Sequence, residues 1–421
     1  MKKSKKLFGL FAFLLVCANV NAGSVGAPQE YPHIRYNYDN VNASLPTFSF
    51  TENLTNGGNY IRVIENSKLD IASNLDINLT SNILHSLSPS VYGEVIGFGA
   101  YGTNNGAPTI NAKDVKIKVE AGAADYHNEP FGMLIRDGAN YSGGNIDINL
   151  ITNSNPNGQE ITALSYGADE ANVTREYNST MKVKDVNIKI VNNQILTSGI
   201  GDNALVGLEQ LGEGNQNTNF VSTGNLNIDI DDKSNSAPYH IAAGIVIEGG
   251  NGTKMTLNNS NIKIKSKADN DYAGGAIVLG YPDYEATTTG QGATLESKGK
   301  MVLDTTEAPD VATLNLHGHG SLFKADFENS SAEIKSGGTA IRFAGISQAL
   351  NADGENTKPG RDLTISLKNA KITTSATAPH SAPLIVVEDG VKNATFNLSG
   401  PGSEAIAADQ NELLLIKGND T

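Results

Sequence analysis

Five aspartates have a spacing that could support catalysis or cation binding. They are Asp229, Asp231, Asp232, Asp269 and Asp271. Paired carboxylates act as general acid and base in enzymes that cleave polysaccharides, and carboxylate oxygens also bind calcium. Apolar and polar residues alternate around the first three, so Asp229 and Asp231 are expected on one solvent-facing side of a strand.

Lysines occupy comparable outward positions in other segments of the same pattern. They are Lys116, Lys118, Lys189, Lys263 and Lys265. A catalytic or calcium site would not interchange carboxylates with ammonium groups in this way. We therefore interpret the aspartates as the polar half of amphipathic strands and predict no catalytic residues.

Two histidines, His317 and His319, lie two positions apart and would share one face if their segment were a strand. A metal site needs three or four ligands, and the other histidines are scattered along the sequence. Gly318 and Gly320 indicate a turn instead. We therefore predict neither a metal site nor a cofactor here.

Other motifs that carry chemistry are absent from the sequence. Neither Gly-x-Ser-x-Gly nor Gly-Asp-Ser-Gly occurs, which disfavours a serine hydrolase. The segment Gly249–Gly252 lacks the lysine of a phosphate-binding loop, and no Gly-Gly-x-Gly-x-Asp calcium repeat is found. These observations disfavour a serine hydrolase, a phosphate-binding loop and a calcium-folded rod.

The elements that position these residues recur along the chain. One phrase alternates apolar residues with Lys, Asp or Asn and returns every 31 to 40 residues at Asn74–Leu79, Asp114–Val119, Gly144–Leu150, Asp185–Ile190, Asn225–Ile230 and Ser260–Ile264, and again at Asp362–Leu367. A second phrase, richer in Gly and Ala, occupies Phe131–Ile135, Ala243–Ile247, Gly275–Leu279, Ala340–Phe343 and Leu384–Val387. Both phrases predict β-strands.

This repetition predicts a right-handed parallel β-helix. Like strands are too far apart in sequence for hairpins, and polar Asn-, Ser-, Thr- and Gly-rich segments connect them. We expect two strands per repeating unit, roughly 20 residues per turn, and a rod about 85 to 90 Å long at ~4.8 Å per stacked strand.

Residues 1–22 have the pattern of a secretory signal peptide. Four lysines precede the apolar stretch Leu7–Val16, and Val20-Asn21-Ala22 resembles a cleavage site. The only cysteine, Cys17, lies within this segment. An alternative is that Cys17 is lipid-modified, although Val16 is unfavourable just before such a cysteine. Export is expected in either case.

The charge balance opposes binding to nucleic acid. The formal net charge is −14 and would become −18 if the four lysines of the signal segment were removed. An acidic surface repels phosphate backbones and anionic lipids.

Beyond the signal segment, we predict an irregular N-terminal cap at residues 23–58 and a β-helix at 59–421. Three polar stretches are expected to be loops that interrupt the stack: Gln210–Thr223, Pro282–Lys300 and Leu350–Arg361. Leu413–Gly418 is expected to begin a further rung, which predicts an open C-terminal end.

A signal peptide, no cysteine after it, Asn-, Gly-, Ser- and Thr-rich β-helical repeats and an acidic balance together resemble the passenger domain of Gram-negative autotransporters, pertactin-like in architecture. The resemblance implies display on the outer-membrane surface through a β-barrel translocator. Such a barrel is not evident in this sequence, which has no Trp and ends at Thr421.

The resemblance also implies adhesin-like binding of a host or bacterial surface protein or glycan, without catalysis. Two alternatives stay open. One is a β-helical polysaccharide lyase or hydrolase, favoured if Asp229, Asp231, Asp269 and Asp271 converge in one groove with a basic residue. The other is a secreted structural filament that assembles end to end.

Overall fold

The computed structural model is all-β over the residues that it describes. These are residues 36–54, 58–81, 95–121, 130–153, 159–168, 178–193, 203–212, 217–233, 240–248, 252–267, 274–280, 292–345, 360–375, 378, 382–408 and 411–417. The expected signal segment, with Cys17, lies outside them.

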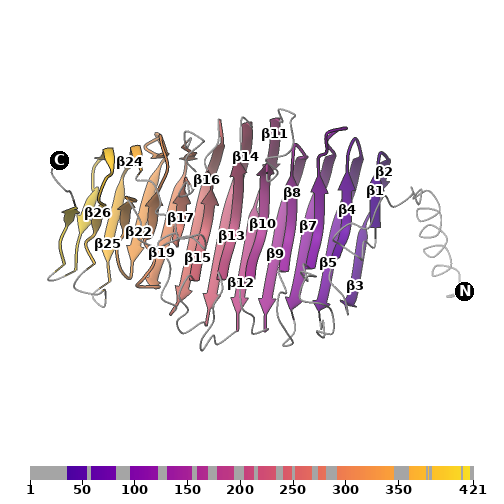
Figure 1. Cartoon of the computed structure of the whole chain (residues 1–421), viewed down its shortest axis with the longest axis horizontal. Coiled ribbons are helices and arrows are strands. Elements are labelled where there is room, and N and C mark those ends of the chain that lie inside the picture. Colours follow the sequence, from indigo (N-terminus) through magenta and orange to yellow (C-terminus); the bar gives the residue numbers. More distant parts are fainter. Residues whose placement is uncertain are drawn as a thin grey trace, which may run out of the picture.

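Parallel strands stack in two long arrays that run the length of a rod (Figure 1). Sheet A has 12 strands within the described part of the chain. In stacking order they are β1 (Tyr36–Asp39), β4 (Gly58–Ile64), β6 (Val95–Tyr101), β8 (Pro130–Arg136), β10 (Gln159–Ala168), β13 (Asn203–Gly212), β15 (His240–Ile247), β17 (Gly275–Leu279), β20 (Leu314–Leu316), β23 (Ile341–Phe343), β26 (Ile385–Val387) and β29 (Leu414–Ile416).

Sheet B bends once along its strands. The two flat parts on either side of the bend are called faces B1 and B2. Face B1 contains β2 (Asn42–Leu45), the first parts of β5 (Lys68–Ser81), β7 (Thr109–Ala121) and β9 (Asn140–Thr152), then β11 (Asn178–Val183), the first parts of β14 (Asn217–Asp232) and β16 (Lys254–Ser266), and β18 (Thr294–Ser297), β21 (Leu322–Ala325), β24 (Arg361–Lys368) and β27 (Lys392–Ser399).

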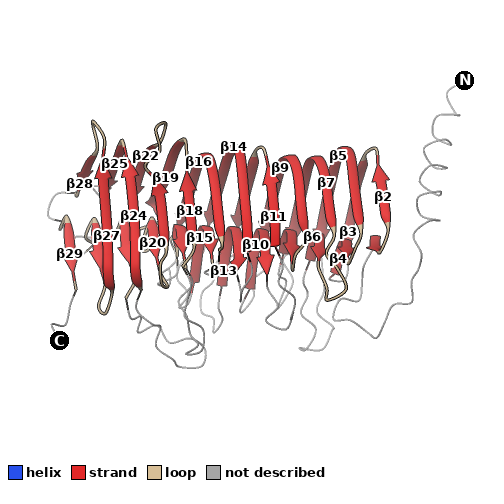
Figure 2. Cartoon of the chain, turned by 90° about the horizontal axis from the view of Figure 1, so that it is seen from above, coloured by secondary structure: helices blue, strands red, loops and turns tan. Residues whose placement is uncertain are grey.

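Face B2 contains the remaining strands of sheet B. They are β3 (Phe48–Leu54), the second parts of β5, β7, β9, β14 and β16, and β12 (Val186–Asn192), β19 (Lys300–Glu307), β22 (Ser331–Ser336), β25 (Ala370–Thr374) and β28 (Glu404–Ile406). The register shifts at Ile71/Asn74 and Ser222/Asn225 mark the bend. Figure 2 shows the parallel strands in succession along the rod.

The predicted parallel β-helix is confirmed, and the alternating phrase lies where expected. Its central isoleucines pair directly from one rung to the next in face B2, from Ile77 through Ile117, Ile148, Ile188 and Ile228 to Ile262. The Gly- and Ala-rich phrase forms sheet A. Stacking of identical side chains buries one continuous core.

The predicted unit of two strands is wrong, because each full rung has three strand segments. One turn is also longer than the expected 20 residues. Successive partners in sheet A differ by 27 positions between Leu314 and Ile341, and by 44 between Leu164 and Leu208. The 12 strands of sheet A therefore span only about 55 Å at the usual strand spacing.

Several predicted boundaries also differ from the structure. The strands begin at Tyr36 and pair with the next rung, so the stack starts inside the segment that was expected to be a cap. All three expected loops overlap strands. The first contains Gln210–Gly212 of β13 and Asn217–Thr223 of β14, the second contains Thr294–Ser297 of β18, and the third ends at Arg361, the first residue of β24. The rest of those stretches lies largely outside the described residues.

The phrase at Asp362–Leu367 belongs to a different column from the other alternating phrases. It lies in β24 of face B1, where Ile365 pairs with Phe323 and Phe396. In that rung the residue that continues the isoleucine column is Ile372, in β25. Alternation identifies a half-buried strand but does not identify its face.

Close contact between sheet A and face B2 explains the glycines of the second phrase. A Cβ atom on Gly132 would lie 2.6 Å from Cγ2 of Ile148, and one on Gly244 would lie 2.4 Å from Cγ2 of Ile262. Gly207 faces Ile228 in the same way, at 2.7 Å. At these three positions the isoleucine column thus packs directly on the backbone of sheet A.

Candidate functional site

The outward aspartates of β14 lie beside lysines of the neighbouring rungs. Asp229 pairs in register with Lys189 of β12 and Lys263 of β16, and Asp231 pairs with Lys265. Asp229 is exposed on face B2. Alternating charges compensate one another across rungs, so these carboxylates belong to a charge ladder.

The ladder continues into β19. Glu307 lies 3.1 Å from Nζ of Lys263 and 3.4 Å from Nζ of Lys265. The hydrogen bond with Glu307 raises the pKa of Lys263, and that with Lys263 lowers the pKa of Glu307. The three side chains are about half exposed, so solvent screens their attraction and each pair adds little stability.

Asp232 differs from the two aspartates before it, because its side chain is buried at 2% exposure. Asn192 Nδ2 donates to one carboxylate oxygen at 2.8 Å, and Ser266 Oγ donates to the other at 2.7 Å. Asp232 is thus part of a buried polar column that links β12, β14 and β16. The remaining two candidates, Asp269 and Asp271, lie outside the described residues.

The two histidines do not meet. His317 follows β20 and is fully buried, and its pKa is lowered to about 3 by burial and by the charge of Arg342. His319 is exposed, and its Nε2 lies 3.0 Å from Oδ2 of Asp362 in β24. The expected turn is present, with φ of 73° at Gly318 and 78° at Gly320.

The outward side of sheet A holds a buried charged cluster that sequence reasoning missed. Arg136 Nη2 donates to Ser165 Oγ at 3.0 Å, and this hydroxyl donates to Glu209 Oε2 at 2.7 Å. The Arg136 and Glu209 side chains are only 14% and 10% exposed, and they lie 3.5 Å apart. The only signal in the sequence is that these polar residues interrupt otherwise apolar strands.

Apolar side chains flank this cluster on the same outward side of sheet A. Ile96, Phe131 and Leu134 form one group, and Val206, Ala243, Val246 and Val278 form another. Both groups are separate from the central core. This side of sheet A is therefore chemically unlike the exposed, charged faces of sheet B.

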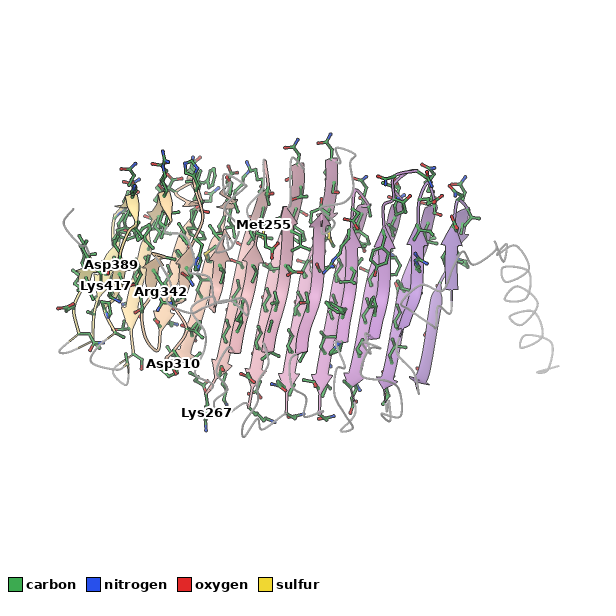
Figure 3. The ribbon with its side chains drawn as sticks, viewed as in Figure 1. Met255, Lys267, Asp310, Arg342, Asp389 and Lys417 are labelled. Carbon is green, nitrogen blue, oxygen red and sulfur yellow. The ribbon has the colours of Figure 1, made fainter. Side chains whose placement is uncertain are left out.

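A second charged cluster lies toward the C-terminal end of sheet A. Glu388 lies 2.8 Å from Nζ of Lys417 and 3.7 Å from Nε of Arg342. Figure 3 labels Arg342 and Lys417 at this end of the rod. One carboxylate thus lies between two cations, which balances part of the positive charge near His317.

The described residues contain no group of three His, Cys, Asp or Glu side chains that could hold a metal ion. Within the same part of the chain, no helix has the length and hydropathy needed to cross a membrane.

Comparisons with known proteins found no match to a family model, to a curated protein or to a solved structure.

Proposed function

We propose that this protein is an exported rod that binds ligands at a cell surface, in the manner of an autotransporter adhesin-like passenger, and has no catalytic activity of its own. The proposed partners are a surface protein or glycan and an outer-membrane translocator. The signal-like residues 1–22 and the acidic balance support export, and the β-helical fold supports the role of a rod.

The observation that carries the proposal is the ordered polar surface of sheet B. Direct side-chain contacts link neighbouring rungs: Asn227 Nδ2 donates to Asn187 Oδ1 at 2.8 Å, and Lys254 lies 2.8 Å from Glu296. Lys371 lies 2.7 Å from Glu404 near the other end. Side chains already held in place lose less entropy when a ligand binds.

The test is to incubate the purified protein with neutral and acidic polysaccharides and with intact cells, and to measure both binding and chain length of the polymers. We expect retention on a surface or glycan with no change in polymer length. Shortening of any polymer would contradict a purely binding function.

A polysaccharide-cleaving enzyme is the second candidate, because Glu209 and Arg136 place a carboxylate beside a cation on one side of sheet A. Cleavage that the Glu209→Gln variant lacks would favour it.

A filament is the third candidate. Ile406, Leu413, Leu414 and Ile416 are between 47% and 66% exposed on the last described rungs. Light scattering that shows only monomer at high concentration would exclude the filament.

A further inference from the structure

A hollow of about 360 Å³ lies on the outside of the bend between faces B1 and B2. It crosses β5, β7 and β9, which are neighbouring strands along the rod in Figure 1. Asp70, Asn111 and Ser142 pair in register and form one wall. Ala72, Lys113 and Gly144 line the bend itself. The hollow thus spans three rungs and faces solvent.

Small residues keep this part of the bend open. A Cβ atom on Gly144 would lie 2.1 Å from the carbonyl oxygen of Lys113, and one on Gly143 would lie 2.5 Å from the hydroxyl of Tyr141. Neither position can therefore carry a side chain without a shift of its neighbours. In the next rung the bend holds Lys184, whose side chain is 66% exposed.

The polar groups of the hollow are held in place and offer both donors and acceptors. Asn111 Nδ2 donates to Asp70 Oδ1 at 2.6 Å, and Lys68 Nζ lies 3.3 Å from Asp70 Oδ2. The hydrogen bond from Asn111 lowers the pKa of Asp70, so its carboxylate is ionised at neutral pH. Ser142 and Lys113 are exposed and add a hydroxyl and an ammonium group.

The charged groups around the hollow indicate which class of ligand it can bind. Asp70 opposes an anion, and Lys68 and Lys113 oppose a cation. A neutral ligand with many hydroxyl groups can use the carboxylate as acceptor, the ammonium as donor, and the amide and hydroxyl as both. Sugars have this chemistry.

We propose that the hollow binds one neutral sugar unit of a surface glycan. This inference rests on the proposed binding function, for which it supplies a place and a ligand class. The hollow is open and shallow, so a single sugar should bind weakly, with a Kd on the order of 1 mM. Higher affinity for a glycan would require further contacts along the rod.

The experiment is an NMR titration of the purified protein with glucose, galactose, mannose and N-acetylglucosamine as separate probes. The Ser142→Trp variant fills the hollow from an outward position and leaves the core unchanged. Thr256→Trp is the matched control, because Thr256 lies in the same outward column of face B1 as Ser142. Ser142 pairs with Lys182, Lys182 pairs with Val221, and Val221 pairs with Thr256.

We expect at least one probe to bind, with affinity reduced at least tenfold in Ser142→Trp and changed less than twofold in Thr256→Trp. Both variants should melt at the wild-type temperature. The proposal is overturned if no probe binds the wild type, or if both variants reduce binding equally. Retention of the wild type on cells without sugar binding would overturn the sugar site alone and leave the proposed function standing.

Discussion

At the scale of single residues, burial changes the acid–base behaviour of His317, the residue that follows β20. The native imidazole stays neutral down to about pH 3, whereas an unfolded histidine binds a proton below about pH 6.5. Between these values the unfolded state binds more protons than the native state. The free energy of unfolding should therefore fall as the pH decreases through this window.

We predict that this histidine contributes about 2 kcal/mol of the stability lost between pH 7 and pH 5. Denaturant unfolding at both pH values measures the loss. The His317→Gln variant should lose less stability than the wild type over that range. The His319→Gln variant, at an exposed position, should keep most of the wild-type pH dependence of the free energy of unfolding. Identical pH dependence in His317→Gln and the wild type would contradict the prediction.

A second prediction separates two aspartates of the same strand. Asp232→Ala removes the carboxylate that accepts from Asn192 and Ser266 and should destabilise the protein by about 1 to 3 kcal/mol, because two buried hydrogen bonds are lost. Asp229→Ala, at an exposed position, should change stability by less than about 0.5 kcal/mol. Equal effects in denaturant unfolding would show that the two carboxylates do not differ in role.

At the scale of elements, contact between the glycine and isoleucine columns determines how closely the sheets approach. Gly244→Ala should destabilise by about 1 to 3 kcal/mol, because its Cβ atom meets Ile262 and the carbonyl oxygen of Ala276. Adding Ile262→Ala removes one of these two clashes. A double-mutant cycle should give a favourable coupling of at least about 0.5 kcal/mol, and additive effects would contradict this packing.

Sequence periodicity predicted the parallel β-helix and most of its long strands, because the apolar residues that recur in the sequence pair in register and form the buried core. It missed the third segment of each rung, since face B1 joins face B2 within single long strands. The bend of β14 has only Gly224 as a turn signal, and β16 contains neither Gly nor Pro. Strands such as Leu314–Leu316 are too short to show a period. The positions of these strands follow from the rungs beside them.

The charged sites were less predictable than the strands. Arg136, Ser165 and Glu209 meet because three successive strands of sheet A align, and the connections between those strands differ in length. No local pattern gives that register. The outward direction of Asp229 was predictable from alternation, but its lysine neighbours come from other rungs.

At the scale of the whole molecule, stability must come from stacking. The sequence contains one cysteine, in the signal-like segment, so no disulfide can link two parts of the chain. We predict that the melting temperature is the same with and without dithiothreitol. A lower melting temperature in reductant would indicate that a disulfide between chains stabilises the rod.

The central claim is that the rod works outside the cell. The most direct measurement is to fractionate native cells, detect the protein with an antibody against the β-helix, and sequence its N-terminus. We predict protein at the cell surface or in the culture fluid, with an N-terminus at Gly23. Protein confined to the cytoplasm that still carries Lys2–Lys6 would contradict the account.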